Sequence, residues 1–253
     1  FPLYFLIVSA GIGIVAGCNS LIANSLGSNN RIAASIYSYN TIIYAILVSI
    51  IVTILGFFFS SDVLKLMGSS EESIILSTNY TNIIFLGTII FLTLTSFNSI
   101  LYAQGDTKTY RNVLIVGLIF NILLNPIFIF GFLFIPAFGI AGLAISTILI
   151  QFCACIFLYY KVNKTRIKII PKIENFSIRR NFMFNIFNQS MPITFALFLV
   201  AAGTFILLFF ISNFGDQAVA GYGAAVRFEH LFSLPVIGLN TAVISIAGQN
   251  FGA

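Results

Sequence analysis

Charged residues are scarce in this sequence: Asp, Glu, Lys and Arg make up only 8% of its 253 residues. Soluble domains average about 25% charged residues. Hydrophobic residues supply 59% of the chain, and its mean hydropathy is +1.04. A chain of this length has too little interior to hide so much apolar surface from water, so we expect lipid to cover it.

Histidine and cysteine are also rare, and tryptophan is absent. The only histidine is His230, which excludes a His-based triad or metal cluster within this chain. The three cysteines, Cys18, Cys153 and Cys155, lie inside apolar stretches without metal-ligand spacing. Because clustered catalytic groups are missing, we do not expect an enzyme, and we expect neither a cofactor nor a bound metal.

Long apolar stretches dominate what is present. They exceed the ~20 residues that a helix needs to cross a bilayer, and they cover residues 2–26, 33–59, 74–103, 112–134, 138–160, 187–211 and 220–247. We therefore predict an all-α fold, a polytopic transmembrane bundle with seven spans here. The third stretch is overlong and has to tilt or project. The chain begins with Phe inside an apolar run, so we expect a truncated start.

The basic residues are distributed unevenly over the connectors. Ten of the twelve lie in connectors on one side of the membrane: Arg31, Lys108, Arg111, Lys161, Lys164, Arg166, Lys168, Lys172, Arg179 and Arg180. The opposite connectors hold only Lys65. This asymmetry predicts a multi-pass protein of the cytoplasmic membrane with a cytoplasmic basic linker at 161–186. The linker favours contact with membrane lipids, not with nucleic acid.

A weak internal repeat joins the two ends of the chain. A shift of 225 residues aligns Gly13–Ser28 with Gly238–Ala253, with identities at Gly13/Gly238, Ser20/Ser245 and Gly27/Gly252. The offset spans six helices, as expected for two six-helix lobes in parallel. We predict an amino-terminal lobe at 1–160 that lacks its first helix, and the first two helices of a carboxy-terminal lobe at 187–253. Four further helices would follow.

Polar residues inside the spans are the candidate functional groups. Asn121 and Asn125 share one helical face, directly before Pro126, which removes a backbone donor and allows a bend. With Thr147 on the next span, their oxygens suit a small cation or a hydrogen-bond relay. Interhelical packing explains the same residues equally well. Glycines four apart, as at Gly13 and Gly17, are typical of close helix packing.

The last span carries the only charged groups deep inside an apolar stretch, Arg227 and Glu229. Ionisable groups within a membrane are costly and are functional candidates by default. Residues two apart point in different directions along a helix, so the two do not form an obvious ion pair. We favour a place in a water-filled cavity over a structural bridge.

Several motifs, in order, resemble those of the multidrug and toxin extrusion (MATE) family. Gly105–Thr109 (GDTKT) resembles the loop after the family's fourth helix, and Asn121–Gly131 resembles its fifth helix. Gly139–Thr147 resembles the start of its sixth helix, and Ala220–Ala253 resembles its eighth. The resemblance covers the family's second to eighth helices.

The resemblance implies a cation-coupled antiporter that exports amphipathic, often cationic drugs or toxins by alternating access, driven by H⁺ or Na⁺. It implies cation-coupling roles for Asn121, Asn125 and Thr147, together with an aspartate of the absent first helix. The lack of a glutamate in residues 192–211 favours the DinF-like branch. We expect a monomer. The alternative in the same superfamily is a flippase for lipid-linked oligosaccharides.

Overall fold

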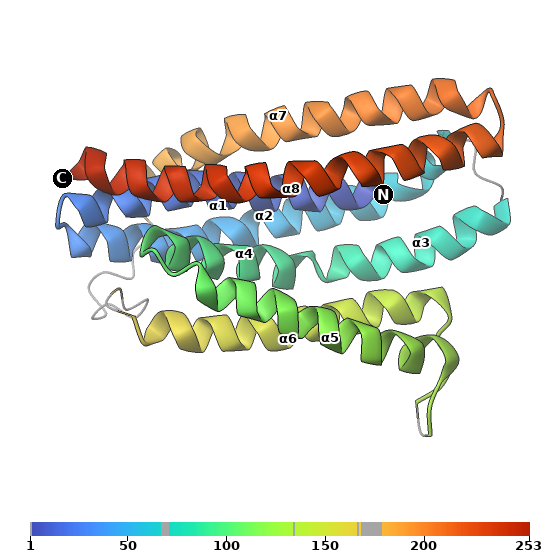
Figure 1. Cartoon of the computed structure of the whole chain (residues 1–253), viewed down its shortest axis with the longest axis horizontal. Helices are drawn as coiled ribbons and strands as arrows, with labels where there is room; N and C mark the ends of the chain where they lie inside the picture. Colours follow the sequence, from blue (N-terminus) through green and yellow to red (C-terminus); the bar gives the residue numbers. More distant parts are fainter. Residues whose placement is uncertain (1, 67–70, 134, 166, 168–178) are drawn as a thin grey trace.

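The chain folds into eight helices in the computed structural model, which describes residues 2–66, 71–133, 135–165, 167 and 179–253. Figure 1 shows them as long, roughly aligned rods. In chain order they are α1 (Pro2–Gly27), α2 (Arg31–Leu66), α3 (Glu71–Leu86), α4 (Thr88–Ala103), α5 (Lys108–Phe130), α6 (Ile140–Asn163), α7 (Arg180–Ser212) and α8 (Asp216–Gly252). Within the described ranges the only β feature is an isolated bridge between Phe132 and Ile135.

The predicted fold class is confirmed. Away from its ends, a helix pairs its main-chain donors and acceptors internally, which is what a bilayer requires of a spanning segment. Six helices of the described residues are long and apolar enough to cross a membrane, and a seventh span results when α3 and α4 are taken together. The observed helices extend beyond several predicted bounds. In particular, Arg180–Ile186 belong to α7, whereas the sequence analysis placed them in the linker.

The predicted third span is broken instead of continuous. It forms α3 and α4, which meet at Gly87 with a bend of 47°. Gly87 is fully covered, and a Cβ there would come within 2.5 Å of the Ile148 side chain on α6. The Thr53 hydroxyl of α2 donates to the Phe85 carbonyl just before the break, at 2.8 Å. A span too long for the bilayer is thus accommodated by a bend that lets α6 approach closely.

Helix α1 lies at the centre of the bundle. It packs against α2, α4, α7 and α8, and Ile14, Cys18 and Ile22 are essentially inaccessible to solvent. The main core cluster also draws residues from α2, α4 and α6, such as Leu92 and Leu158. Because α1 contacts α4 on one side and both α7 and α8 on the other, it joins the first six helices to the last two.

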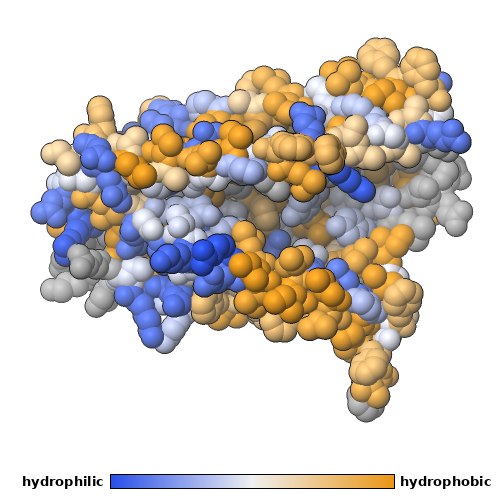
Figure 2. All heavy atoms as spheres, in the orientation of Figure 1, coloured by the Kyte–Doolittle hydropathy of each residue, from blue (hydrophilic) through white to orange (hydrophobic). Residues whose placement is uncertain are grey.

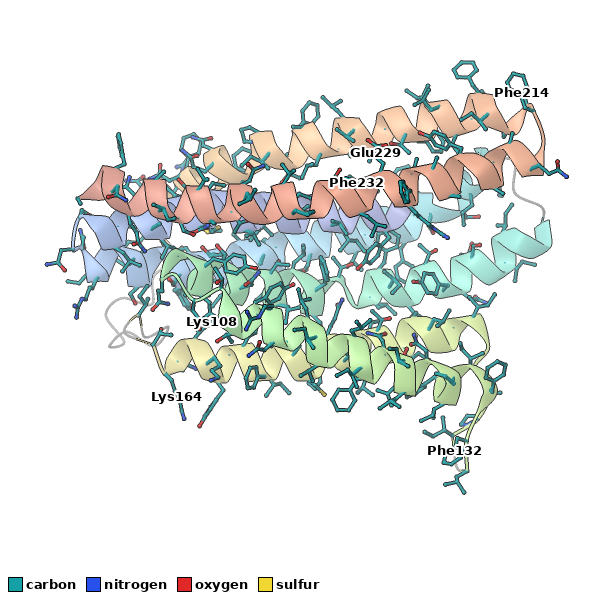
Figure 3. The ribbon with its side chains drawn as sticks, in the orientation of Figure 1. Lys108, Phe132, Lys164, Phe214, Glu229 and Phe232 are labelled. Atoms are coloured by element: carbon teal, nitrogen blue, oxygen red, sulfur yellow. The ribbon has the colours of Figure 1, made fainter. Side chains whose placement is uncertain are left out.

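The two ends of the bundle differ in charge. Lys108 and Lys164 lie near one end, which holds the α4–α5 connection and the end of α6 (Figure 3). Phe132 and Phe214 lie at the opposite end, in the α5–α6 and α7–α8 turns. Hydrophobic side chains form broad patches between the ends on the face shown in Figure 2. Residues 166 and 168–178 of the basic linker lie outside the described residues.

Candidate functional site

The first candidate site lies where α5 packs against α6. Helix α5 continues through Pro126 to Phe130. Proline has no main-chain N–H, so the carbonyl of Ile122, four residues earlier, loses its usual helical partner. On the other side, Gly142 of α6 sits directly against the Phe128 carbonyl, with no room for a side chain. The two helices therefore approach closely beside the weakened part of α5.

Asn125 is joined to α6 by a hydrogen bond. The Ser146 hydroxyl donates to Asn125 Oδ1 at 2.5 Å. Ser146 is completely buried, and its hydroxyl also lies 3.0 Å from the Leu143 carbonyl of its own helix. A hydroxyl carries one proton, so the two acceptors compete for it. Ser146 was not among the site residues predicted from the sequence, although Ser146 directly precedes Thr147.

Asn121 and Thr147 make their hydrogen bonds within their own helices. Asn121 Nδ2 donates to the Gly117 carbonyl at 3.0 Å, and the Thr147 hydroxyl donates to the Leu143 carbonyl at 2.8 Å. Thr147 lines a small cavity with Tyr4 and Phe91, on the side of α6 that faces α1, α3 and α4. The structure therefore joins Asn125 to Ser146 and turns Thr147 toward a different set of helices.

Two further buried asparagines belong to the same bundle. Asn98 on α4 and Asn40 on α2 are 3% and 0% exposed, and the side-chain oxygen of each has no hydrogen-bond partner among the described residues. Asn40 uses its amide group to donate to the Ile36 carbonyl at 2.9 Å. A buried acceptor without a donor is costly and needs an explanation. The sequence feature that could have identified both asparagines is a polar residue within an apolar span.

The second candidate group is on α8. Arg227 and Glu229 are both exposed, and Glu229 lies part-way along the helix (Figure 3). Neither forms an ion pair within the part of the chain that the structure describes. They are separate charged groups on α8, as their spacing predicted.

The two copies of the internal repeat cross one another where α1 ends. Gly27 packs against the main chain at Gln249, and Gly252 packs against the main chain at Asn24. The repeat pairs Asn24 with Gln249 and Gly27 with Gly252, so the contacts are reciprocal. We call these four residues the α1/α8 junction. In each contact a glycine of one copy admits the main chain of the other.

Polar side chains tie the junction to α4. The Ser245 hydroxyl lies 3.0 Å from Asn19 Oδ1 and 3.0 Å from the Tyr102 carbonyl. Asn19 Nδ2 donates to the Thr241 carbonyl at 3.3 Å, and Gln249 Nε2 donates to the Ala103 carbonyl at 2.7 Å. Close main-chain approach and these hydrogen bonds together hold α1, α4 and α8 against one another at this end of the bundle.

Comparison with known proteins places these features in a family. The MatE family model matches residues 1–127 and 192–253. Two relatives are probable multidrug resistance proteins from Bacillus subtilis. YoeA is 27% identical over 100% of this chain and 55% of its own length. YpnP is 33% identical over 78% of this chain and 43% of its own length. A FAD transporter of Shewanella oneidensis is 24% identical over 100% of this chain and 56% of its own length. The chain spans about half the length of the curated relatives it matches.

Solved structures agree on the fold. A structure described as the outward-facing conformation of a multidrug resistance MATE family transporter has a TM-score of 0.86 and 23% identity, and covers 100% of this chain and 56% of its own. A second structure, described as the inward-facing conformation, has a TM-score of 0.83 and 24% identity. It covers 96% of this chain and 55% of its own. The helices, their order and the family match agree: this chain belongs to the MatE family of transporters.

Proposed function

We propose that the protein containing this chain is a cation-coupled antiporter, not an enzyme, which exports amphipathic and often cationic compounds across the cytoplasmic membrane. The printed names of YoeA and YpnP, probable multidrug resistance proteins, support this cargo. The Shewanella relative is described as a FAD transporter, so cargo differs among relatives. In the described part of the chain, no cluster of His, Cys, Asp or Glu side chains is found, and polar residues are dispersed along apolar helices.

The observation that carries the proposal is the Asn125–Ser146 hydrogen bond beside Pro126. An amide oxygen is an uncharged ligand for Na⁺ and an acceptor for a water that relays H⁺. A cation that is coordinated by Asn125 Oδ1 competes with the Ser146 hydroxyl for this oxygen. The Ser146 hydroxyl can then donate to its second acceptor, the Leu143 carbonyl. Exchange between these partners changes how α5 is held to α6 at the point where α5 bends most easily.

Alternating access requires one end of the pathway to close while the other opens. The α1/α8 junction closes the end that carries Lys108 and Lys164. Between the layer of α7 and α8 and the layer of α5 and α6, the surface is hollowed on the face that Figure 2 shows, toward the opposite end. We propose that this arrangement is the outward-open state. Arg227 and Glu229 would then line the cavity.

The coupling step is tested by transport in vesicles. We expect purified full-length protein in proteoliposomes to move ethidium against its gradient only when a H⁺ or Na⁺ gradient is imposed. Ethidium fluorescence, recorded for each gradient separately, identifies the ion. Ethidium movement that is equally fast without any ion gradient would indicate a channel. Translocation of a labelled lipid-linked oligosaccharide, with no ethidium transport, would indicate the flippase.

The orientation in the membrane gives a second expected result. In a cysteine-free background, Ala137→Cys in the exposed α5–α6 turn should react with an impermeant maleimide in intact cells. Thr107→Cys, exposed at the basic end between α4 and α5, should react only after permeabilisation. The positive-inside asymmetry is the physical reason. The reverse pattern of labelling would place the linker 161–186 outside and reverse the direction of transport.

A further inference from the structure

A long groove runs between α2 and α7, with α1 at its base. Its volume is about 870 Å³, within the ~300–1,000 Å³ typical of ligand pockets. The side chains that line it are overwhelmingly apolar. From α7 they include Met183, Phe184, Phe187 and Met191, and from α2 they include Leu47 and Ile51. The candidate coupling residues on α5 and α6 do not contribute to this groove.

The groove is apolar inside a membrane-spanning region, which restricts what can fill it. Ile51 is 57% exposed and Phe184 is 61% exposed. Both α2 and α7 have the length and hydropathy of spanning helices. Ordered water is unfavourable in such a groove, because the lining offers almost no hydrogen-bonding partners. A hydrocarbon chain from the bilayer suits it better.

Of the described residues, one charged residue lines the groove, and it lies at the basic end. Arg180 is the first residue of α7 and is exposed. Its guanidinium has no hydrogen-bond or ion-pair partner among the residues that the structure describes. A guanidinium is a strong, bidentate partner for phosphate. The groove therefore combines one anion-binding group at its end with an apolar channel that leads away from it.

The groove is longer than one leaflet. Its lining on α7 extends from Arg180 to Phe198, a rise of about 27 Å at ~1.5 Å per residue, which is close to the ~30 Å hydrocarbon core. The part from Arg180 to Met191 rises about 16 Å and has the depth of a single leaflet. A headgroup phosphate at Arg180 would place the chain along Phe184 and Phe187, and its end near Met191.

We propose that this groove binds an anionic phospholipid of the leaflet at the basic end. Its phosphate pairs with Arg180, and one acyl chain lies between α2 and α7. The charge of Arg180 selects an anionic headgroup over a zwitterionic one, whereas the apolar lining accepts either chain. Because α2 and α7 belong to the two predicted lobes, the bound lipid contacts both.

The absence of tryptophan from this chain allows a direct test. Phe187→Trp in full-length protein cleared of other tryptophans places one reporter in the groove. In vesicles of phosphatidylcholine, phosphatidylglycerol brominated at the middle of its chains should quench this tryptophan about fivefold more effectively than brominated phosphatidylcholine. One surface Lys or Arg supplies a preference of this size. A Phe152→Trp reporter, exposed on α6 outside the groove, should show no such preference.

Variants identify the group responsible. Arg180→Gln should abolish the preference for phosphatidylglycerol, Arg180→Lys should keep most of it, and Arg111→Gln, exposed outside the groove, should leave it unchanged. Equal quenching by both lipids in the Phe187→Trp parent overturns the proposal, as does a preference that survives Arg180→Gln. Displacement of the brominated lipid by ethidium would make the groove a substrate pocket and also overturns it.

Discussion

Gly252→Leu should open the basic end of the transporter and reduce drug efflux by at least tenfold. A side chain at this position meets the main chain of Asn24, and one at Gly27 meets the main chain of Gln249. Neither clash can be relieved by rotating a side chain, so α1 and α8 have to separate. Overpacking of this kind costs about 1–3 kcal/mol, which shifts a two-state equilibrium by roughly 5- to 150-fold.

The measurement combines efflux with thiol accessibility in inverted vesicles. Ala23 is completely buried and lies against Gly248, directly beside the α1/α8 junction. In the Gly252→Leu background, Ala23→Cys should react at least tenfold faster with an impermeant maleimide than in the parent. Gly238→Leu is the matched control, because it is on the same helix and the structure places nothing within 4 Å of its Cβ. It should leave both efflux and labelling close to the parent.

Two outcomes would contradict this role of the junction. Gly252→Leu and Gly238→Leu with equal efflux would mean that the close approach of α1 and α8 is incidental. Unchanged labelling at position 23, with efflux lost, would mean that the variant acts elsewhere than at this end. Expression measured by immunoblot separates either result from failure to fold.

The number and placement of the spans followed from hydropathy, because a bilayer imposes a minimum apolar length on every crossing segment. The break in the third span did not follow from it. Residues 74–103 form one continuous apolar stretch in the sequence, and a single glycine at position 87 did not predict a bend. The bend depends on α6, whose Ile148 occupies the space that a side chain at Gly87 would need. A contact between segments so far apart in the sequence cannot be predicted from a local hydropathy pattern.

The candidate site was predictable in its residue types but not in its pairings. Asn125 and its neighbouring proline were recognisable as polar and helix-bending features within an apolar span. Its partner Ser146 and the neighbouring Thr147 are adjacent in sequence and so differ by about 100° around α6. Which of them faces α5 depends on the rotation of α6, set here by the packing of Gly142 against Phe128. The repeat, in contrast, identified residues that do lie together at the α1/α8 junction.

Asn125→Leu should abolish ion-driven efflux while leaving drug binding and membrane expression largely intact. The substitution removes the oxygen that accepts from Ser146 in the side-chain hydrogen bond that joins α5 to α6. A hydrogen bond between membrane helices contributes only ~0.6 kcal/mol on average and up to ~1.7 kcal/mol. Loss of the bond should therefore be tolerated by the fold, and a loss of transport reports the loss of the acceptor.

Two companion variants separate coupling from packing. Ser146→Ala breaks the same hydrogen bond but keeps the Asn125 oxygen, so efflux should fall only severalfold. Asn125→Asp keeps an oxygen and adds an ionisable group, so transport should persist with an altered pH dependence. Efflux in proteoliposomes is measured against external pH for all three, with ethidium binding measured by fluorescence anisotropy. If the Asn125→Leu protein expresses well and still couples efflux to the ion gradient, the oxygen of Asn125 has no part in the mechanism.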